Sequence, residues 1–147
     1  MNPESLLPEV TSPEVQAFLT GFPLTLLHAG VSLVLLFVGA TLYALLTPYK
    51  EISQIRDGNA AASVSFAGVI LALAIPLALS LAGSTSVREL AIWGGATVLV
   101  QLLVFRIVDL VLMGLPARVQ EGEVSAAVLL VGAKLACAAL LAAAVAG

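Results

Sequence analysis

Residues 58–83 read GNAAASVSFAGVILALAIPLALSLAG, and residues 122–147 read GEVSAAVLLVGAKLACAALLAAAVAG. At an offset of 64 positions the two stretches share 11 identities over 26 residues, and Gly68 aligns with Gly132. Each stretch is long and apolar enough to cross a bilayer as a helix, which takes about 20 residues. The pair therefore predicts a membrane protein with an internal repeat.

Composition indicates the same class of protein. Of the 147 residues, 61% are hydrophobic and 10% are charged, whereas a soluble domain has about 25% charged residues. A small domain leaves much of its surface in contact with solvent, so this excess of apolar side chains predicts lipid as the solvent. The net charge of −3, with no basic patch, argues against a nucleic-acid partner.

Two more apolar stretches complete the predicted fold, an all-α membrane protein with four transmembrane helices. The predicted spans cover residues 23–46, 60–82, 90–113 and 124–146. Short connections make two tandem helical hairpins, residues 23–83 and 84–147. The first and third spans cross in the same direction, so the repeats are parallel, related by an axis along the membrane normal.

The N-terminal extension, residues 1–22, differs from a signal peptide because it is acidic and lacks Lys and Arg. Ser12, Pro13 and Glu14 are typical of a helix start. We expect a short helix there, lying at the membrane surface or running into the first span. Ser86 and Glu89 have capping-box spacing and predict the start of the third span.

Small residues indicate how the spans pack. Gly68 and Gly132 lie in rows of small residues spaced four apart, which let helix backbones approach closely in lipid. The alanines of these rows are Ala72, Ala74, Ala78, Ala82, Ala136, Ala138, Ala142 and Ala146. Pro76 is expected to kink the second span. The rows serve either the fold of one chain or a homo-oligomer, and a generic alanine-rich span is the alternative.

Polar residues inside the last two spans carry the main chemical signal: Gln101, Arg106, Asp109 and Lys134. The first three fall on one side of a helix, and Arg106 and Asp109 are three residues apart. Lys134 lies near the middle of its span, where an unpaired charge costs about 3 kcal/mol or more. We expect Lys134 to snorkel, pair with Asp109 or Glu123, or line a wet cavity. The cluster is interpreted either as an ion, proton or solute pathway or as a packing contact.

Signals for catalysis are missing from the sequence. His28 has no second ligand at metal-binding spacing, and Cys137 has no base near it in helical register. No glycine-rich loop of the phosphate-binding kind is present. The sequence therefore predicts no catalytic residue, no metal, no cofactor and no enzyme.

Several short motifs carry a resemblance to a known family. They are Thr47-Pro48, Glu51, Ile55, Asn59-Ala60-Ala61-Ala62-Ser63, Phe66-Ala67-Gly68, Ile75-Pro76-Leu77, Trp93-Gly94-Gly95 and Gln101-Leu102-Leu103-Val104-Phe105. In this order they resemble the YjfL-like bacterial inner-membrane proteins, domain of unknown function 350, over residues 28–147. The second repeat departs from the family pattern, because Glu123 stands where that pattern has an asparagine.

The resemblance implies a four-span protein of the bacterial inner membrane with duplicated hairpins, and no established activity. Members of the family lie beside genes for ATP-grasp ligases, which implies a link to a polyamine- or peptide-conjugating system. The main hypothesis is an oligomeric membrane scaffold or partner subunit, with an accessory membrane-associated protein as a partner. The alternative is a small oligomeric channel or transporter that uses the charges of the second repeat.

Basic residues predict the orientation of the chain. Lys50, Arg56 and Arg118 lie in the loops at residues 47–59 and 114–123, against Arg88 alone on the other side. The positive-inside rule places these two loops in the cytoplasm and both termini in the periplasm. Tyr49 and Trp93 fit as interfacial anchors.

The orientation is testable by thiol labelling. In a Cys137→Ala background, Ser53→Cys should resist an impermeant thiol reagent in intact cells, because its loop faces the cytoplasm. Ser5→Cys should be labelled under the same conditions. Labelling at position 53 together with protection at position 5 would show that the chain is inserted the other way round.

Overall fold

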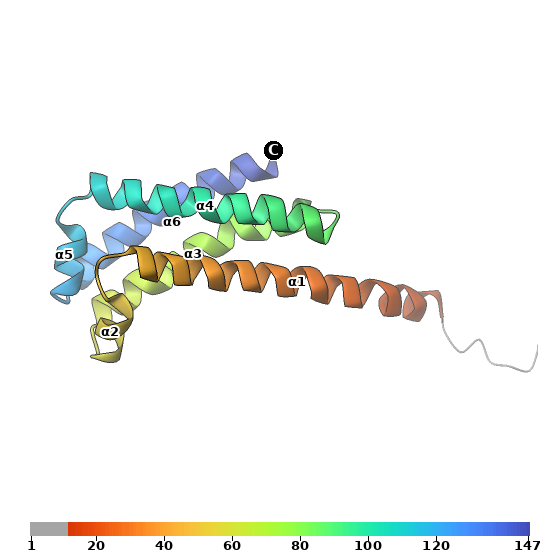
Figure 1. The fold of residues 1–147 in the computed structure, drawn as a ribbon, viewed down its shortest axis with the longest axis horizontal. Coiled ribbons are helices and arrows are strands. Elements are labelled where there is room, and N and C mark those ends of the chain that lie inside the picture. Colours follow the sequence, from red (N-terminus) through yellow and green to blue (C-terminus); the bar gives the residue numbers. More distant parts are fainter. Residues whose placement is uncertain (1–11) are drawn as a thin grey trace, which may run out of the picture.

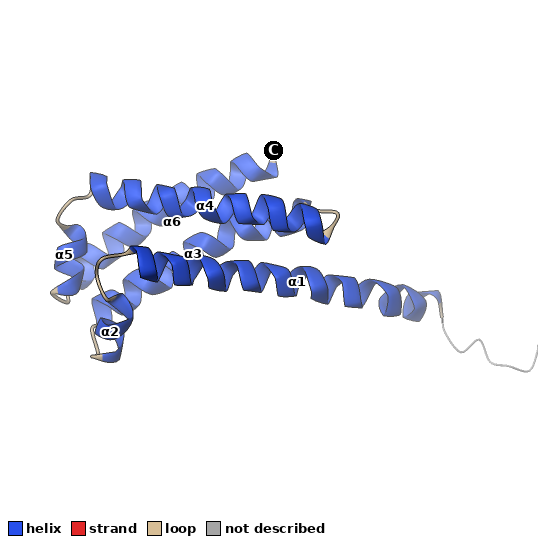
Figure 2. Ribbon diagram, viewed as in Figure 1, coloured by secondary structure: helices blue, strands red, loops and turns tan. Residues whose placement is uncertain are grey.

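The computed structural model of the chain describes residues 12–147, which are helical and contain no strand. Figure 2 shows this all-helical character. The helices are α1 (Pro13–Leu46), α2 (Glu51–Arg56), α3 (Ala60–Gly83), α4 (Val87–Val111), α5 (Leu115–Gln120) and α6 (Val124–Ala146). The four long helices are each apolar and long enough to cross a membrane, as the sequence predicted.

The bundle has two distinct ends. The short helices α2 and α5 lie together at one end, and the turn between α3 and α4 lies at the other (Figure 1). We call these the α2–α5 end and the α3–α4 end. Their connections had been expected to be loops, but each contains a helix of six residues. Such helices are too short to show a periodic apolar pattern in the sequence.

The first long helix distinguishes the two arrangements expected for the N-terminal extension, a helix at the membrane surface or one that runs into the first span. Residues 13–22 form no separate surface helix, because α1 runs without a break from Pro13 through Pro23 to Leu46. At 1.5 Å per residue this helix is about 51 Å long, well beyond the ~30 Å apolar layer of a bilayer. Its N-terminal part projects past the α3–α4 end of the bundle (Figure 1).

Helix starts follow local chemistry that was visible in the sequence. The Ser12 side chain accepts a hydrogen bond from the Val15 N–H, and Ser86 accepts one from the Glu89 N–H. The Glu89 carboxylate accepts from Thr85, one residue earlier than a standard capping box has it.

Helices α3 and α6 form the most extensive contact of the bundle. Gly68 and Ala72 of α3 are buried, whereas Ala78 and Ala82 are exposed. The predicted row of small residues is therefore only partly the packing surface of α3. On α6, Lys134 lies among the buried packing residues Ala126, Ala127, Leu130, Ala138 and Ala142.

Glycines allow the closest approaches between helices. A Cβ atom added at Gly68 would lie 2.9 Å from the Cβ of Val131 in α6, and still closer to that residue's methyl groups. A Cβ at Gly39 of α1 would lie 2.9 Å from Val98 Cγ1 in α4. Gly132 has no neighbour within 4 Å of the same position and is exposed within the single chain. Only one of the two aligned glycines therefore marks a close contact between α3 and α6.

The contrast between the two glycines makes a matched pair of variants. Gly68→Ala should lower the free energy of unfolding by about 1–3 kcal/mol, the usual cost of overpacking, because Val131 leaves no room for the methyl group. Gly132→Ala should have little effect. Thermal unfolding of both purified variants in the same detergent measures the difference, and equal midpoints would contradict the proposed contact.

Candidate functional site

Lys134 is a charged residue in the interior of the bundle. It lies ten positions after Val124, the first residue of α6, and its side chain is 1% exposed. Its Nζ forms an ion pair with Asp109 Oδ1 of α4 at 2.9 Å and donates a hydrogen bond to the Tyr43 hydroxyl of α1 at 3.0 Å. A single ammonium group therefore joins three of the four long helices.

Two aromatic rings complete the surroundings of the ammonium group. Lys134 Nζ lies 4.9 Å from the centroid of the Tyr43 ring and 5.4 Å from that of Phe105. The two rings pack edge to face, with centroids 5.8 Å apart and an interplanar angle of 88°. The faces of such rings attract cations, and more strongly where water is excluded. The site thus stabilises a positive charge in an apolar interior.

Tyr43 connects this charge to a carboxyl group at the α2–α5 end. Its hydroxyl donates to Glu51 Oε1 at 3.2 Å, and Glu51 is buried at the first position of α2. Burial raises the pKa of the Glu51 carboxyl, and the Lys134 ammonium opposes this rise. Glu51 is therefore a carboxyl group that takes up a proton more readily than an exposed one.

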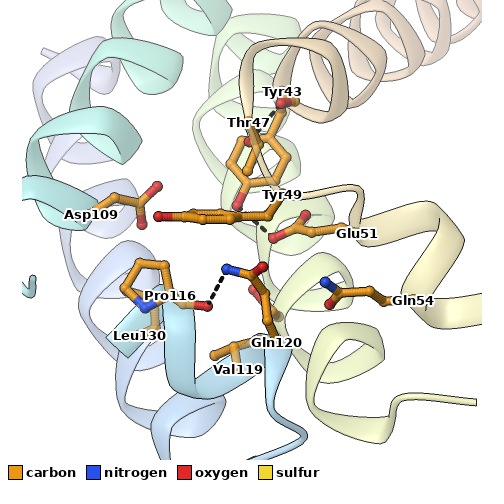
Figure 3. A pocket seen from close by; sticks show the side chains of 11 residues that line it. Tyr43, Thr47, Tyr49, Glu51, Gln54, Asp109, Pro116, Val119, Gln120 and Leu130 are labelled. Atoms are coloured by element: carbon orange, nitrogen blue, oxygen red, sulfur yellow. Dashed lines mark hydrogen bonds between the residues drawn. The ribbon is translucent and has the colours of Figure 1, made fainter. Parts of the chain in front are cut away.

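A small cavity lies beside these groups at the α2–α5 end (Figure 3). Tyr43, Glu51 and Asp109 line it from three helices, and the Tyr49 ring lies between Asp109 and Glu51. The space open to a water-sized sphere is about 10 Å³, near the minimum for one water molecule. The cavity therefore connects the α2–α5 end with Tyr43 and Asp109, the two residues that contact Lys134.

Comparison with known proteins places the chain in a family. Residues 17–145 match the family described as Domain of Unknown Function (DUF350). The chain belongs to the DUF350 family. It is 33% identical over 107 residues to the UPF0719 inner membrane protein YjfL of Escherichia coli (strain K12), covering 73% of this chain and 80% of that protein. The protein of the same name from Escherichia coli O157:H7 matches equally well.

No solved structure matches this DUF350 protein. Its inner-membrane relatives and its four apolar helices make it a multi-pass inner-membrane protein. The family is uncharacterised, so any activity has to be argued from the site itself.

The motif residues that resemble the DUF350 pattern gather largely at the α2–α5 end. The Asn59 side chain accepts from the Ala62 N–H at 3.0 Å and donates to the carbonyls of Val119 and Gln120 at 3.2 and 3.1 Å. Asn59 thus both starts α3 and ties it to α5. Thr47 is buried and donates to the Tyr43 carbonyl at 2.7 Å, which holds the end of α1.

The other positions singled out by the family pattern differ in their exposure. Glu123 occupies the position aligned with Asn59, but it pairs with Arg118 and accepts from Ser125 at 2.6 Å. Arg118 holds the pKa of Glu123 below its usual value. Pro48 and Trp93 are exposed, whereas Pro76 is buried inside an unbroken α3. Glu123 is thus no partner of Lys134.

The expected cluster of Arg106, Asp109 and Lys134 is only partly right. Lys134 and Asp109 pair, whereas Arg106 is exposed on the outer face of α4. Phe105, Asp109 and Arg106 follow one another around α4 at steps of about 40° and 60°. Phe105 points into the core and Asp109 lies at its edge, so Arg106 falls outside. Gln101 is fully buried on the inner face.

The sequence did not identify Tyr43 as part of the site, and it identified Glu51 only through the family motif. Tyr43 is 91 positions from Lys134, so no local spacing joins the two. Within residues 12–147, no group of His, Cys, Asp and Glu side chains is placed to hold a metal ion. The buried groups are suited to holding and moving a proton.

The ion pair is testable by a double-mutant cycle on thermal stability. Asp109→Asn should destabilise the protein by about 3–5 kcal/mol, because it leaves a buried cation without its partner. Asp109→Asn combined with Lys134→Met should cost less than Asp109→Asn alone. Arg106→Gln is the matched control, since Arg106 is exposed on the same helix. Additive effects within about 0.5 kcal/mol would contradict the coupling.

Proposed function

We propose that this protein moves protons across the membrane, with Lys134 as the central carrier. One observation carries the proposal: an almost fully buried lysine, about 15 Å from the nearest end of its helix at 1.5 Å per residue, contacts an acid and a phenol that leads to a second acid. Ionisable side chains inside a membrane protein are costly and commonly mark ion or proton pathways.

The hydrogen bonds around Tyr43 give the transfer a direction. Lys134 donates to the Tyr43 hydroxyl, and this hydroxyl donates to Glu51. A proton leaving the ammonium for the Tyr43 oxygen, as the phenolic proton passes to the Glu51 carboxylate, leaves a neutral amine, an intact phenol and a carboxylic acid. Glu51 then releases its proton into the cavity at the α2–α5 end. Asp109 stabilises the charged form of Lys134 between transfers.

The proposal includes two tandem hairpin repeats and the orientation inferred from the basic residues. Helix α5 begins and ends 64 positions after α2, and Gly58 and Gly122 share a left-handed φ of 87° and 88°. Both features support a duplication. The residues aligned with Asp109 and Lys134 are Leu45 and Ile70, so each chain would have one proton site. With the α2–α5 end in the cytoplasm, protons would leave on that side.

A scaffold role is the second candidate, and α1 is the feature that favours it. Within α1 only Gly39 and Tyr43 are buried, and Phe37 and Leu45 are 74% and 76% exposed. The rings of Phe18 and Phe22 stack on each other in the N-terminal part of α1, and both side chains are exposed. A long apolar surface of this kind suits a second copy of the chain or an accessory membrane protein, as in a homo-oligomeric scaffold.

Proton flux into liposomes separates the two roles. Purified protein is reconstituted with a pH-sensitive dye inside, and a potassium diffusion potential drives protons inward. Wild-type protein should acidify the interior, and Lys134→Met should slow this on the order of a hundredfold, the usual contribution of a positioned proton-transfer group. Arg106→Gln should behave as wild type, because it lies outside the path.

Two results would count against transport. Equal flux through wild-type protein and Lys134→Met would mean that the proton does not pass the lysine. Flux no greater than in protein-free liposomes, from folded wild-type protein, would leave the scaffold role as the better account.

A further inference from the structure

Gln101 is a buried polar residue that the path around Lys134 does not use. It is fully buried in α4, and within residues 12–147 neither Oε1 nor Nε2 has a hydrogen-bond partner. A buried amide that makes no hydrogen bond loses its hydration without compensation. The amide therefore needs a partner beyond these described residues, and water offers both a donor and an acceptor.

The position of Gln101 continues a line of side chains along one face of α4. Thr97, Gln101, Phe105 and Asp109 are spaced four residues apart, so they lie one above another on the same side of the helix. Thr97, Gln101 and Phe105 are buried. Asp109 lies at the edge of the core, and its carboxylate pairs with the buried Lys134. Gln101 lies ten residues before the end of α4, and Lys134 lies ten residues after the start of α6. The two are therefore at similar depth in adjacent helices.

The line reaches a polar contact between α3 and α4. The Thr97 hydroxyl lies 3.2 Å from the Ser80 hydroxyl and donates to the Trp93 carbonyl at 2.7 Å. Ser80 also lines a cavity of about 310 Å³ at the α3–α4 end, together with Ser84 and Glu89. Polar groups thus lead from that end of the bundle to within one helical turn of Gln101.

Phe105 separates this line from the Lys134 site. Its ring is fully buried, lies 5.4 Å from Lys134 Nζ and packs edge to face against Tyr43. It sits one turn from Asp109 and one turn from Gln101 on α4. An apolar ring in this place interrupts any chain of water molecules between the two halves of the bundle.

We propose that Ser80, Thr97 and Gln101 form the second half of the proton path, with Phe105 as the plug between this half and Lys134. This inference rests on the proposed function. Water hydrogen-bonded to the Gln101 amide carries a proton inward from the cavity at the α3–α4 end. When the Phe105 ring turns aside, a hydronium ion there gives its proton to the neutral amine of Lys134, which leaves water and restores the ammonium ion.

Gln101→Leu tests the amide with a side chain of similar size. Replacing the unpaired amide by an apolar group should raise the thermal midpoint, whereas proton flux into liposomes should fall at least about tenfold because the water loses its partner. Leu103→Ala, on the exposed face of α4, is the control and should keep wild-type flux. A raised midpoint with unchanged flux would overturn the proposal and make Gln101 a packing residue.

Silver ions give a readout that does not depend on transport. These ions are small enough to follow a path of the width of a water molecule, and they react with any thiol at its end. In a Cys137→Ala background, silver added at the α3–α4 side should protect Thr97→Cys and Gln101→Cys from later labelling under denaturing conditions. Silver added at the α2–α5 side should protect neither, unless Phe105→Leu is also present.

The two readouts distinguish the ways of failing. Protection of both positions from the α3–α4 side, without any proton flux, would support the water path and refute the proposed function. Absence of protection from either side would refute the path even if Lys134 carries protons. Protection from the α2–α5 side with Phe105 intact would show that Phe105 is not the plug.

Discussion

The buried ammonium group of Lys134 is the constraint on which the arrangement of the long helices depends. A lysine near the middle of a span costs about 3 kcal/mol or more unless it is paired or hydrated. Here the charge is met by Asp109 from α4 and by the hydroxyl and ring of Tyr43 from α1. Helix α1 has only two buried residues, and Tyr43 is one of them. Through Tyr43, Lys134 therefore helps to position α1, which is the least buried of the four long helices.

The interior combines this paired charge with an unpaired amide, and the difference between the two is informative. A polar group kept only for packing is expected to have its hydrogen bonds satisfied, because a partly satisfied network is worse than an apolar core. Lys134 meets that expectation and Gln101 does not. Helices α3 and α6 already pack closely through Gly68 against Val131. That contact does not involve Gln101, and the unpaired amide of Gln101 favours a role in moving water or charge.

Local chemistry was readable from the sequence, and contacts between distant residues were not. The four spans and the capping by Ser12 and Ser86 depend on neighbouring residues, and they appear as predicted. The cost of a lone charge predicted that Lys134 would snorkel, line a wet cavity or pair with Asp109 or Glu123, and the structure pairs it with Asp109. Tyr43 carried no such signal, because a tyrosine near a helix end also fits an interfacial anchor. Arg106 was misplaced because a polar arc on a helix does not reveal where the core ends.

The two candidate roles use different surfaces of the same chain. The proposed proton path consists of side chains inside the bundle, such as Lys134 and Gln101, and would need no second copy. The outward faces of α1, with Phe37 and Leu45, contribute nothing to that path and are open to lipid or to another protein. A partner bound there would act on the proposed path through Tyr43, because the same helix carries the hydroxyl that links Lys134 to Glu51. A partner that moved α1 would therefore alter the proton path, which joins the two roles physically.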